Sequence, residues 1–267
     1  MNHLMVLVVL IVTAIPAWAD QVPVTGRHQD MTFTPYEVND YAAAAYHKLL
    51  AKQKRRGLID TDPALVARVR RVTKRLVRHA EQLKYEAYQW HWEVHVSDAD
   101  DVNAFSMAGG KLLIGSHFIR KYRLTDGELA MVLAHEIAHA LAEHVREQLS
   151  EVQLRHPRYP YTVAEASAEM GSDIAVYLSL MPLSELQEGE ADHIGVYLLA
   201  ASGYPPKAAV GFYRKLVRED RGQRRSMFAT HMPDRARLKA VMGYVAEAKA
   251  LRSAAAAQVS VPARDFQ

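Results

Sequence analysis

The chain has 267 residues, of which 49% are hydrophobic and 24% are charged, a composition typical of a globular protein that excludes extended disorder. Lysine and arginine outnumber aspartate and glutamate by 33 to 30, and the resulting formal net charge of +3 is too small to indicate nucleic-acid binding. Cysteine is absent, which excludes a disulfide framework and the lipid-modified cysteine of a lipobox.

The first 19 residues have the pattern of a cleavable signal peptide. An apolar run from Leu4 to Val12 is followed by Pro16 and by the small-x-small cleavage site Ala17-Trp18-Ala19, before Asp20. The run is shorter than the roughly 20 residues that cross a membrane. No lysine or arginine precedes the run, which is weaker than usual for a signal peptide. The run is nevertheless too short for a comfortable membrane span, so an uncleaved anchor is the less favoured alternative. We therefore expect a periplasmic protein without a transmembrane helix.

The remaining residues are predicted to form one domain. Residues 20–35 are expected to be an exposed lead-in, residues 36–252 the folded domain, and residues 253–267 a flexible tail. The domain is expected to begin with a helix from Tyr36 to about Lys54. No internal repeat period is present.

A second helix is predicted from Pro63, a residue that suits the first helical turn, to Leu83. Its apolar residues recur at helical spacing. The opposite face is basic and carries Arg68, Arg70, Arg71, Lys74, Arg75 and Arg78. Contact of this face with solvent is the favoured interpretation, and contact with anionic lipid is the alternative.

Two strands are predicted after the second helix. Apolar and polar residues alternate between Trp90 and Val96, which is the period of a half-buried strand. Residues 111–115 follow a Gly109-Gly110 turn and are expected to be a pairing strand. The sequence therefore predicts a small sheet beside the helices.

The most informative motif lies at residues 135–139. His135 and His139 are four residues apart, a spacing that on a helix places both imidazoles on one face, close enough to bind the same metal ion. Glu136, between them, can reach a metal-bound water. The structural alternative is a pair of histidines with ordinary partners on a half-buried helix.

The surrounding residues predict the helix that this motif needs. Thr125 and Glu128 form a capping box, and apolar residues at helical spacing continue the helix toward Arg146. His144 lies five residues after His139 and is therefore rotated away from the ligand face. The third metal ligand has to come from another part of the chain.

A downstream acidic helix offers candidates for the third ligand. Ser184 and Gln187 form a second capping box, which predicts the start of this helix. Glu188 and Asp192 are four residues apart, so one can bind the metal while the other holds a ligating histidine through its second ring nitrogen. The alternative is an acidic first turn that only complements the helix dipole, as expected for Glu190.

These residues resemble the HExxH…ExxAD signature of the CaaX-prenyl-protease-like (Ste-type) zinc metallopeptidases. That family includes the HtpX membrane protease, the periplasmic BepA and LoiP proteases and the mitochondrial OMA-type proteases. Residues 135–139 and 188–192 carry the resemblance. Residues 103–114 resemble the family's NAF…GG segment, and residues 230–233 with Arg237 resemble its T-H-P…R element, with Met232 inserted.

The resemblance extends over about residues 35–245 and implies a fold, a cofactor and a ligand set. The implied fold is α+β, a mostly helical zincin-like (gluzincin) metallopeptidase domain with a small antiparallel sheet. The implied cofactor is one Zn2+ per chain, bound by His135, His139 and Glu188. Glu136 is the implied general base.

Further roles are expected around this ligand set. Asp192 is expected to orient a ligating histidine. His231 either approaches the metal as a fourth ligand that latches the enzyme, as the resemblance implies, or caps a helix that begins near Asp234. Arg237 either stabilises an oxyanion or lies on the surface of that helix. Residues 150–183 are expected to be a loop that covers the cleft.

Together, these expectations predict a metalloendopeptidase. The family resemblance implies that it acts on misfolded or misassembled envelope proteins, and that it has peripheral contact with the envelope or the outer-membrane assembly machinery. Leu112, Leu113 and Ile114 are expected to bind an extended substrate as an edge strand. The alternative is a zinc-stabilised chaperone or assembly factor that binds polypeptide without cutting it. Retention of Glu136 favours the enzyme, and a small-molecule metallohydrolase is disfavoured.

Overall fold

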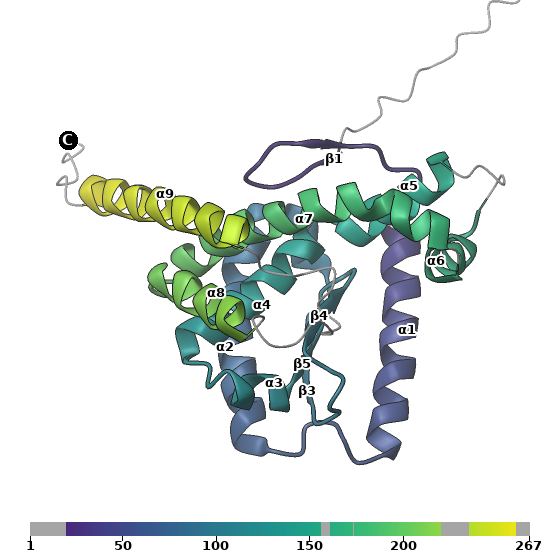
Figure 1. The fold of residues 1–267 in the computed structure, drawn as a ribbon, viewed down its shortest axis with the longest axis horizontal. Coiled ribbons are helices and arrows are strands. Elements are labelled where there is room, and N and C mark those ends of the chain that lie inside the picture. Colours follow the sequence, from purple (N-terminus) through teal and green to yellow (C-terminus); the bar gives the residue numbers. More distant parts are fainter. Residues whose placement is uncertain (1–19, 156–160, 173, 220–234, 260–267) are drawn as a thin grey trace, which may run out of the picture.

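The computed structural model describes residues 20–155, 161–172, 174–219 and 235–259. Long helices surround a small three-stranded sheet (Figure 1), which confirms the predicted mostly helical α+β fold. Within the described ranges, no helix is both long and apolar enough to cross a membrane. The predicted signal peptide, residues 1–19, lies outside them.

The helices and the strands have the following bounds, in chain order. The helices are α1 (Pro35–Arg55), α2 (Pro63–Leu83), the 3-10 helix η1 (Tyr85–Gln89), α3 (Ser116–Lys121), α4 (Asp126–Leu141), α5 (His144–Arg155), α6 (Val163–Ser172), α7 (Ile174–Ala201), α8 (Lys207–Glu219) and α9 (Arg235–Val259). The strands are β1 (Asp20–Gln21), β2 (His28–Gln29), β3 (Glu93–Ser97), β4 (Ala104–Met107) and β5 (Lys111–Gly115).

The three-stranded sheet has the order β3-β5-β4 and is mixed, so the prediction of an antiparallel sheet was wrong for one of its two pairings. Leu113 of β5 lies opposite Phe105 of antiparallel β4 and opposite His95 of parallel β3. Gly109 and Gly110, at φ of 72° and 78°, form the tight turn that pairs β4 with β5. Strand alternation predicts a strand but not its neighbours, which is why the parallel pairing was missed.

β5 is the central strand of this sheet, so the prediction that Leu112, Leu113 and Ile114 form an exposed edge was wrong. All 5 residues of β5 are buried, as expected of a strand that is covered on both faces. Within the described residues, the edges of the sheet are β3, which contacts α2, and β4, which contacts α1 and α4. A free backbone edge near α4 therefore belongs to β4.

The N-terminal residues form a hairpin against the domain instead of the expected exposed lead-in (Figure 1). β1 pairs with β2, and Val22 and Phe33 are buried at 1% and 6% exposure. The buried Gln29 amide donates a hydrogen bond to the carbonyl oxygen of Ala142, at 2.9 Å. Residues 20–34 therefore belong to the folded domain.

α7 is longer than predicted and begins at Ile174 rather than at Ser184. α5, α6 and the first turns of α7 occupy most of residues 150–183, where a loop was expected. Pro182 lies within α7, and Gln187 is buried, with its amide donating to Glu147 at 2.7 Å. Ser184 and Gln187 resemble a helix start locally, but packing against α5 and α6 extends the helix beyond them.

At the other end of the domain, α9 continues to Val259, so residues 253–259 are helical rather than part of the expected tail. The remainder of that predicted tail, residues 260–267, lies outside the described residues.

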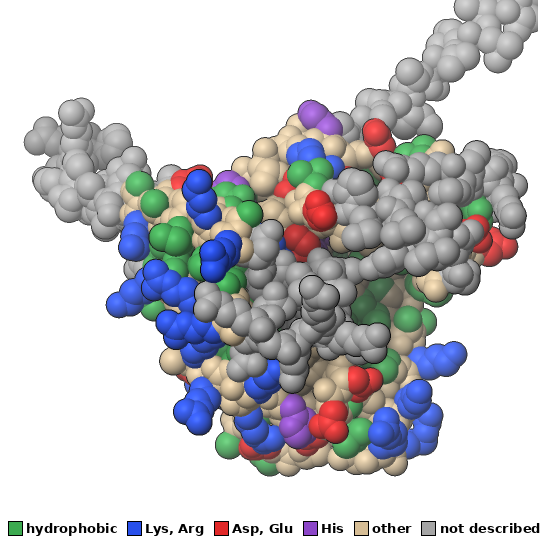
Figure 2. All heavy atoms as spheres, in the orientation of Figure 1, with side chains coloured by type: hydrophobic (Ala, Val, Ile, Leu, Met, Phe, Trp, Pro, Cys, Tyr) green, Lys and Arg blue, Asp and Glu red, His purple; other side chains and the backbone are tan. Residues whose placement is uncertain are grey.

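The basic side of α2 contacts acidic groups of the same protein. Arg68 and Arg71 bind Asp126 at 2.7 and 3.2 Å. Arg70 binds Asp60 at 2.9 Å. From the sequence, these arginines were expected to face solvent or anionic lipid. Their acidic partners within the protein were not predicted. Lysine and arginine side chains also gather at the C-terminal end of α1 (Figure 2).

The close contact between α4 and α7 positions the functional site, and a glycine permits it. A Cβ atom on Gly195 of α7 would lie 3.0 Å from the Met131 Cε and 3.2 Å from the backbone nitrogen of His135. Contacts this short are tighter than ordinary van der Waals packing. Gly195 therefore allows α7 to approach α4 beside the HExxH motif.

We expect Gly195→Ala to be less stable than Gly189→Ala by about 1–3 kcal/mol, because only the first change overpacks the helix contact. Gly189 lies on the same helix, and a Cβ there meets no heavy atom of the described residues within 4 Å. Both changes gain the same helix propensity, so their difference isolates the contact. Denaturant unfolding of the two variants measures it, and equal stabilities would contradict the role given to Gly195.

Candidate metal centre

α4 carries the HExxH motif on a buried face. Its predicted capping box is confirmed, since the backbone N–H of Thr125 donates to the Glu128 carboxylate (2.8 Å) and the N–H of Glu128 to the Thr125 hydroxyl (3.3 Å). His135 and Glu136 are 7% and 4% exposed. The helix therefore presents its functional groups toward the interior.

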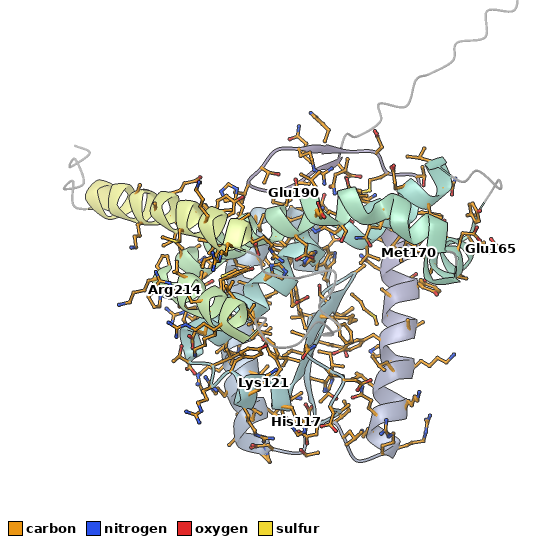
Figure 3. The ribbon with its side chains drawn as sticks, in the orientation of Figure 1. His117, Lys121, Glu165, Met170, Glu190 and Arg214 are labelled. Atoms are coloured by element: carbon orange, nitrogen blue, oxygen red, sulfur yellow. The ribbon has the colours of Figure 1, made fainter. Side chains whose placement is uncertain are left out.

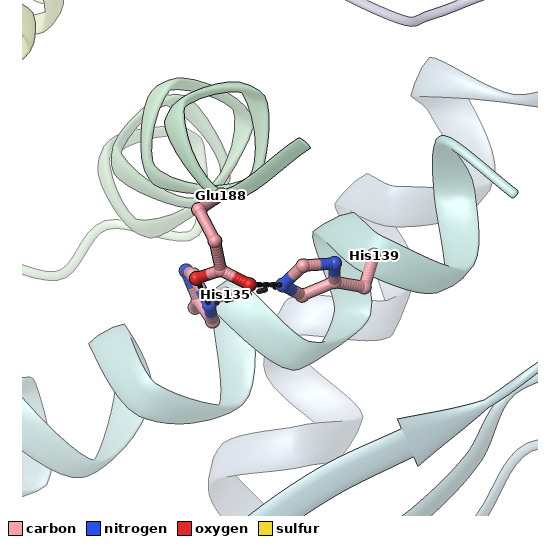
Figure 4. Close-up of side chains that lie close together, drawn as sticks. All are labelled: His135, His139 and Glu188. Atoms are coloured by element: carbon pink, nitrogen blue, oxygen red, sulfur yellow. Dashed lines mark hydrogen bonds and ion pairs between the residues drawn. The ribbon is translucent and has the colours of Figure 1, made fainter. Parts of the chain in front are cut away.

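The structure brings His135, His139 and Glu188 together (Figure 4). The two Nε2 atoms lie 3.1 Å apart. The Glu188 carboxylate lies 3.4 Å from Nε2 of His135 and 3.3 Å from Nε2 of His139. Ligands about 2.0 Å from a tetrahedral ion are about 3.3 Å from one another, so these three groups fit a single metal ion.

The charges around the three residues favour a cation. Burial lowers the pKa of His139 to about 3, so its ring is neutral, the form that binds a metal. Burial acts in the same direction on His135, but hydrogen bonds with Asp192 and Glu188 outweigh it and raise the pKa of His135 to about 10. The carboxylates thus hold a positive charge at this point, which either a proton or a metal ion can supply.

Asp192 of α7 supports the ring of His135. Its Oδ1 atom lies 3.0 Å from Nδ1 of His135. It also accepts hydrogen bonds from the Tyr213 hydroxyl and from Nε and Nη2 of Arg237, the latter two at 2.9 and 2.8 Å. This geometry matches the orienting role expected of Asp192, because a partner on Nδ1 directs Nε2 toward the ligand position.

Arg237 reaches this site from α9, with a side chain that is only 17% exposed. Its Nη1 atom lies 3.2 Å from the Glu188 carboxylate, while the rest of its guanidinium binds Asp192. The alternative that placed Arg237 on the helix surface was therefore wrong. The structure gives it two buried carboxylates to neutralise, and its role at an oxyanion stays a prediction.

Comparison with known proteins identifies the family, because residues 63–245 match peptidase family M48. The chain belongs to peptidase family M48. It is 36% identical over 129 residues to the mitochondrial metalloendopeptidase OMA1 of Arabidopsis thaliana, which covers 47% of this chain and 26% of that protein.

Two further relatives of this M48 chain are also named as proteolytic enzymes. The mitochondrial metalloendopeptidase OMA1 of Schizosaccharomyces pombe is 26% identical over 239 residues, or 87% of this chain and 68% of that protein. The beta-barrel assembly-enhancing protease of Escherichia coli K12 is 28% identical over 172 residues, or 60% of this chain and 34% of that protein. The family resemblance seen in the sequence is thus confirmed, although the chain spans well under half of the first and third relatives.

Sequence reasoning missed two residues beside the candidate metal centre, His144 and Glu190. α4 ends at Leu141 rather than continuing to Arg146, and α5 begins at His144. The Nδ1 atom of His144 lies 2.8 Å from Nδ1 of His139, and its Nε2 atom lies 3.3 Å from the Glu190 carboxylate. His144 and Glu190 therefore support His139 much as Asp192 supports His135.

The sequence contains little that predicts this arrangement. The chain turns at Glu143, which has a φ of 50°, yet neither Ala142 nor Glu143 is a residue type that ends a helix. On an uninterrupted helix His144 would point away from His139. Glu190 was assigned only to the helix dipole, but it is buried, and its bonds with Arg27 and His144 outweigh desolvation and lower its pKa to about 2.

The roles of two predicted residues, Glu136 and His231, stay predictions. Glu136 is buried on α4 beside His135, and its role as general base stays a prediction. His231 lies outside the described residues, so both of its alternatives, latch and helix cap, stay predictions.

Proposed function

We propose that this protein is a zinc-dependent endopeptidase. The observation that carries the proposal is the convergence of His135, His139 and Glu188, with Glu136 on the same helix, in a member of peptidase family M48. Two imidazoles and a carboxylate are a donor set that suits zinc and leaves a position open for water or substrate. When bound, zinc lowers the pKa of a water molecule and polarises a carbonyl group.

Side chains of this protein would carry out metal binding and proton transfer. His135, His139 and Glu188 would hold the ion, and Glu136 would accept the proton of the attacking water and return it to the leaving amine. Burial of Glu136 and of the ligands His135 and Glu188 limits the access of bulk water, which strengthens their interactions with charge that develops in the transition state.

The substrates we propose are extended polypeptides, bound along β4 instead of β5. Within the described residues β4 pairs only with β5, and it contacts the helix that carries the HExxH motif. An extended segment can add to such an edge through backbone hydrogen bonds, which require little side-chain selectivity. This supports activity on unfolded or misassembled chains.

We place this activity in the periplasm, on misfolded or misassembled envelope proteins. The signal-peptide pattern of residues 1–19 supports that location. A relative named for enhancing beta-barrel assembly supports the substrate class and peripheral contact with the outer-membrane assembly machinery. The relatives named as mitochondrial show that the domain type also occurs in another compartment.

The test is cleavage of casein, an unfolded protein, by purified residues 20–267 with one equivalent of zinc. We expect cleavage that a chelator abolishes and that added zinc restores. Zinc binding without any cleavage, by both the wild type and a His231→Ala variant, would overturn the endopeptidase proposal in favour of a polypeptide-binding factor. Failure to bind zinc at all would overturn the metal centre itself.

A further inference from the structure

Arg27 of the N-terminal hairpin binds two buried carboxylates on two different helices. Its guanidinium contacts Glu147 of α5 at 2.5 and 2.8 Å and Glu190 of α7 at 2.8 Å through both Nε and Nη2. The Glu147 and Glu190 side chains are 7% and 6% exposed. Such bidentate contacts fix the position of each carboxylate and also neutralise its charge. Figure 3 shows Glu190 on α7 near the hairpin. Arg27 of the hairpin binds it there.

Glu190 links this cation to the metal centre. His139 presents Nε2 to His135 and Glu188, so Nε2 is its metal-binding atom and its hydrogen lies on Nδ1. That hydrogen is donated to Nδ1 of His144, and the hydrogen on Nε2 of His144 is donated to Glu190. The donors thus run in one direction, from the ligand ring to a carboxylate that Arg27 holds.

Loss of the Arg27 guanidinium would disturb this series of hydrogen bonds at Glu190, the member farthest from the metal ligands. Glu147 and Glu190 would then lie close together in the interior without the cation that both bind, an arrangement that costs free energy. Glu190 is then expected to move or to change partners, and His144 would lose the acceptor that fixes its ring. The ring of His139 would be held less firmly.

The other ligating histidine has a comparable arrangement. His135 is followed by Asp192 and then by Arg237 of α9, whereas His139 is followed by His144, Glu190 and an arginine of the hairpin. Each series of contacts therefore ends at an arginine guanidinium, that of Arg237 for His135 and that of Arg27 for His139. This parallel indicates that the hairpin arginine belongs to the metal-binding unit.

We propose that Arg27 is a positioning residue of the metal centre, which fixes the ring of His139 through Glu190 and His144. The N-terminal hairpin is then part of the metal-binding unit rather than a cover over the domain. The inference rests on the proposed function, in which His139 is a metal ligand.

The test measures zinc affinity of the full domain by competition with a chromophoric chelator. We expect Arg27→Ala to weaken zinc binding about tenfold, the lower end of the range for residues that support a ligand. Arg27→Lys keeps the charge but not the fork geometry, and we expect it to recover part of the loss. Gln21→Ala is the matched control, since Gln21 is an exposed residue of the same hairpin whose side chain bonds to His28 instead of to the carboxylates that Arg27 binds.

Two further readouts separate positioning from a purely structural role. The visible spectrum of the cobalt-substituted protein should change in Arg27→Ala, because it reports ligand geometry. The double variant Arg27→Ala/His144→Phe should bind zinc as weakly as His144→Phe alone, because both changes break one chain of contacts. Circular dichroism and thermal unfolding check that each variant is folded.

The outcomes distinguish this inference from the proposed function. Zinc binding by a folded Arg27→Ala variant equal to that of wild type, or independent losses that multiply in the double variant, would overturn the role of Arg27. If the wild-type protein itself does not bind zinc, the proposed function fails first.

Discussion

Glu136→Gln is expected to reduce casein cleavage by about 10²–10⁴-fold while zinc binding is unchanged. Glutamine has the shape of glutamate but cannot accept a proton from the attacking water. The histidines and Glu188 keep their positions, because the substitution removes no ligand. The measurement combines cleavage rates with the zinc content of each variant.

Glu185→Gln is the matched control for this variant. Glu185 is an exposed carboxylate on α7, the helix that carries Glu188, so the same chemical change there should leave cleavage unchanged. A Glu136→Gln variant that binds zinc and cleaves casein at the wild-type rate would show that another group is the base. A variant that loses zinc would show that Glu136 serves the metal site itself.

The part of the site that local geometry determines could be predicted from the sequence. Two histidines four residues apart meet on any helix, and Thr125 with Glu128 predicts where that helix begins. The same spacing places Glu188 and Asp192 on one face of α7, where they contact the centre. Helical periodicity therefore accounts for these positions.

The residues that prediction missed depend on contacts between distant segments. His144 reaches His139 only because the chain turns at Glu143, and Arg27 meets Glu190 only because the hairpin packs on α7. Neither contact leaves a periodic pattern in the sequence. The same limit applies to β5, whose buried run predicts a strand while its place between β3 and β4 depends on the whole sheet.

The site also shows why a charge in a sequence is difficult to interpret. Arg237 and Arg27 each resemble an ordinary surface arginine, yet each binds carboxylates that are almost fully buried. Burying a carboxylate is costly unless a cation accompanies it, so a protein that buries several acids around a metal must supply cations from elsewhere. Here Arg27 of the N-terminal hairpin and Arg237 of α9 supply them.

Asp192→Ala is expected to weaken zinc binding by about 10–100-fold and to lower the free energy of unfolding by about 3–5 kcal/mol. Asp192 is 1% exposed and binds His135, Tyr213 and Arg237 at once. Without it, the ring of His135 loses its partner on Nδ1. The guanidinium of Arg237 loses its principal carboxylate while it remains buried.

Arg237 explains why the effect on zinc should exceed a loss of ring orientation. Its Nη1 atom already lies 3.2 Å from Glu188, so in Asp192→Ala the guanidinium is attracted to Glu188 alone and competes with the metal for it. Adding Arg237→Leu to Asp192→Ala should therefore restore part of both the zinc affinity and the stability. Zinc competition and denaturant unfolding of the single and double variants measure these effects.

Asp126→Ala provides the contrast on the surface of the protein. Asp126 also binds two arginines, Arg68 and Arg71, but its side chain is 48% exposed, so its removal should cost less than about 1 kcal/mol and leave zinc binding unchanged. If Asp192→Ala is no more harmful than Asp126→Ala, the buried carboxylate is not what holds His135. If the added Arg237→Leu change worsens zinc binding further, the guanidinium supports the ligands directly instead of competing for them.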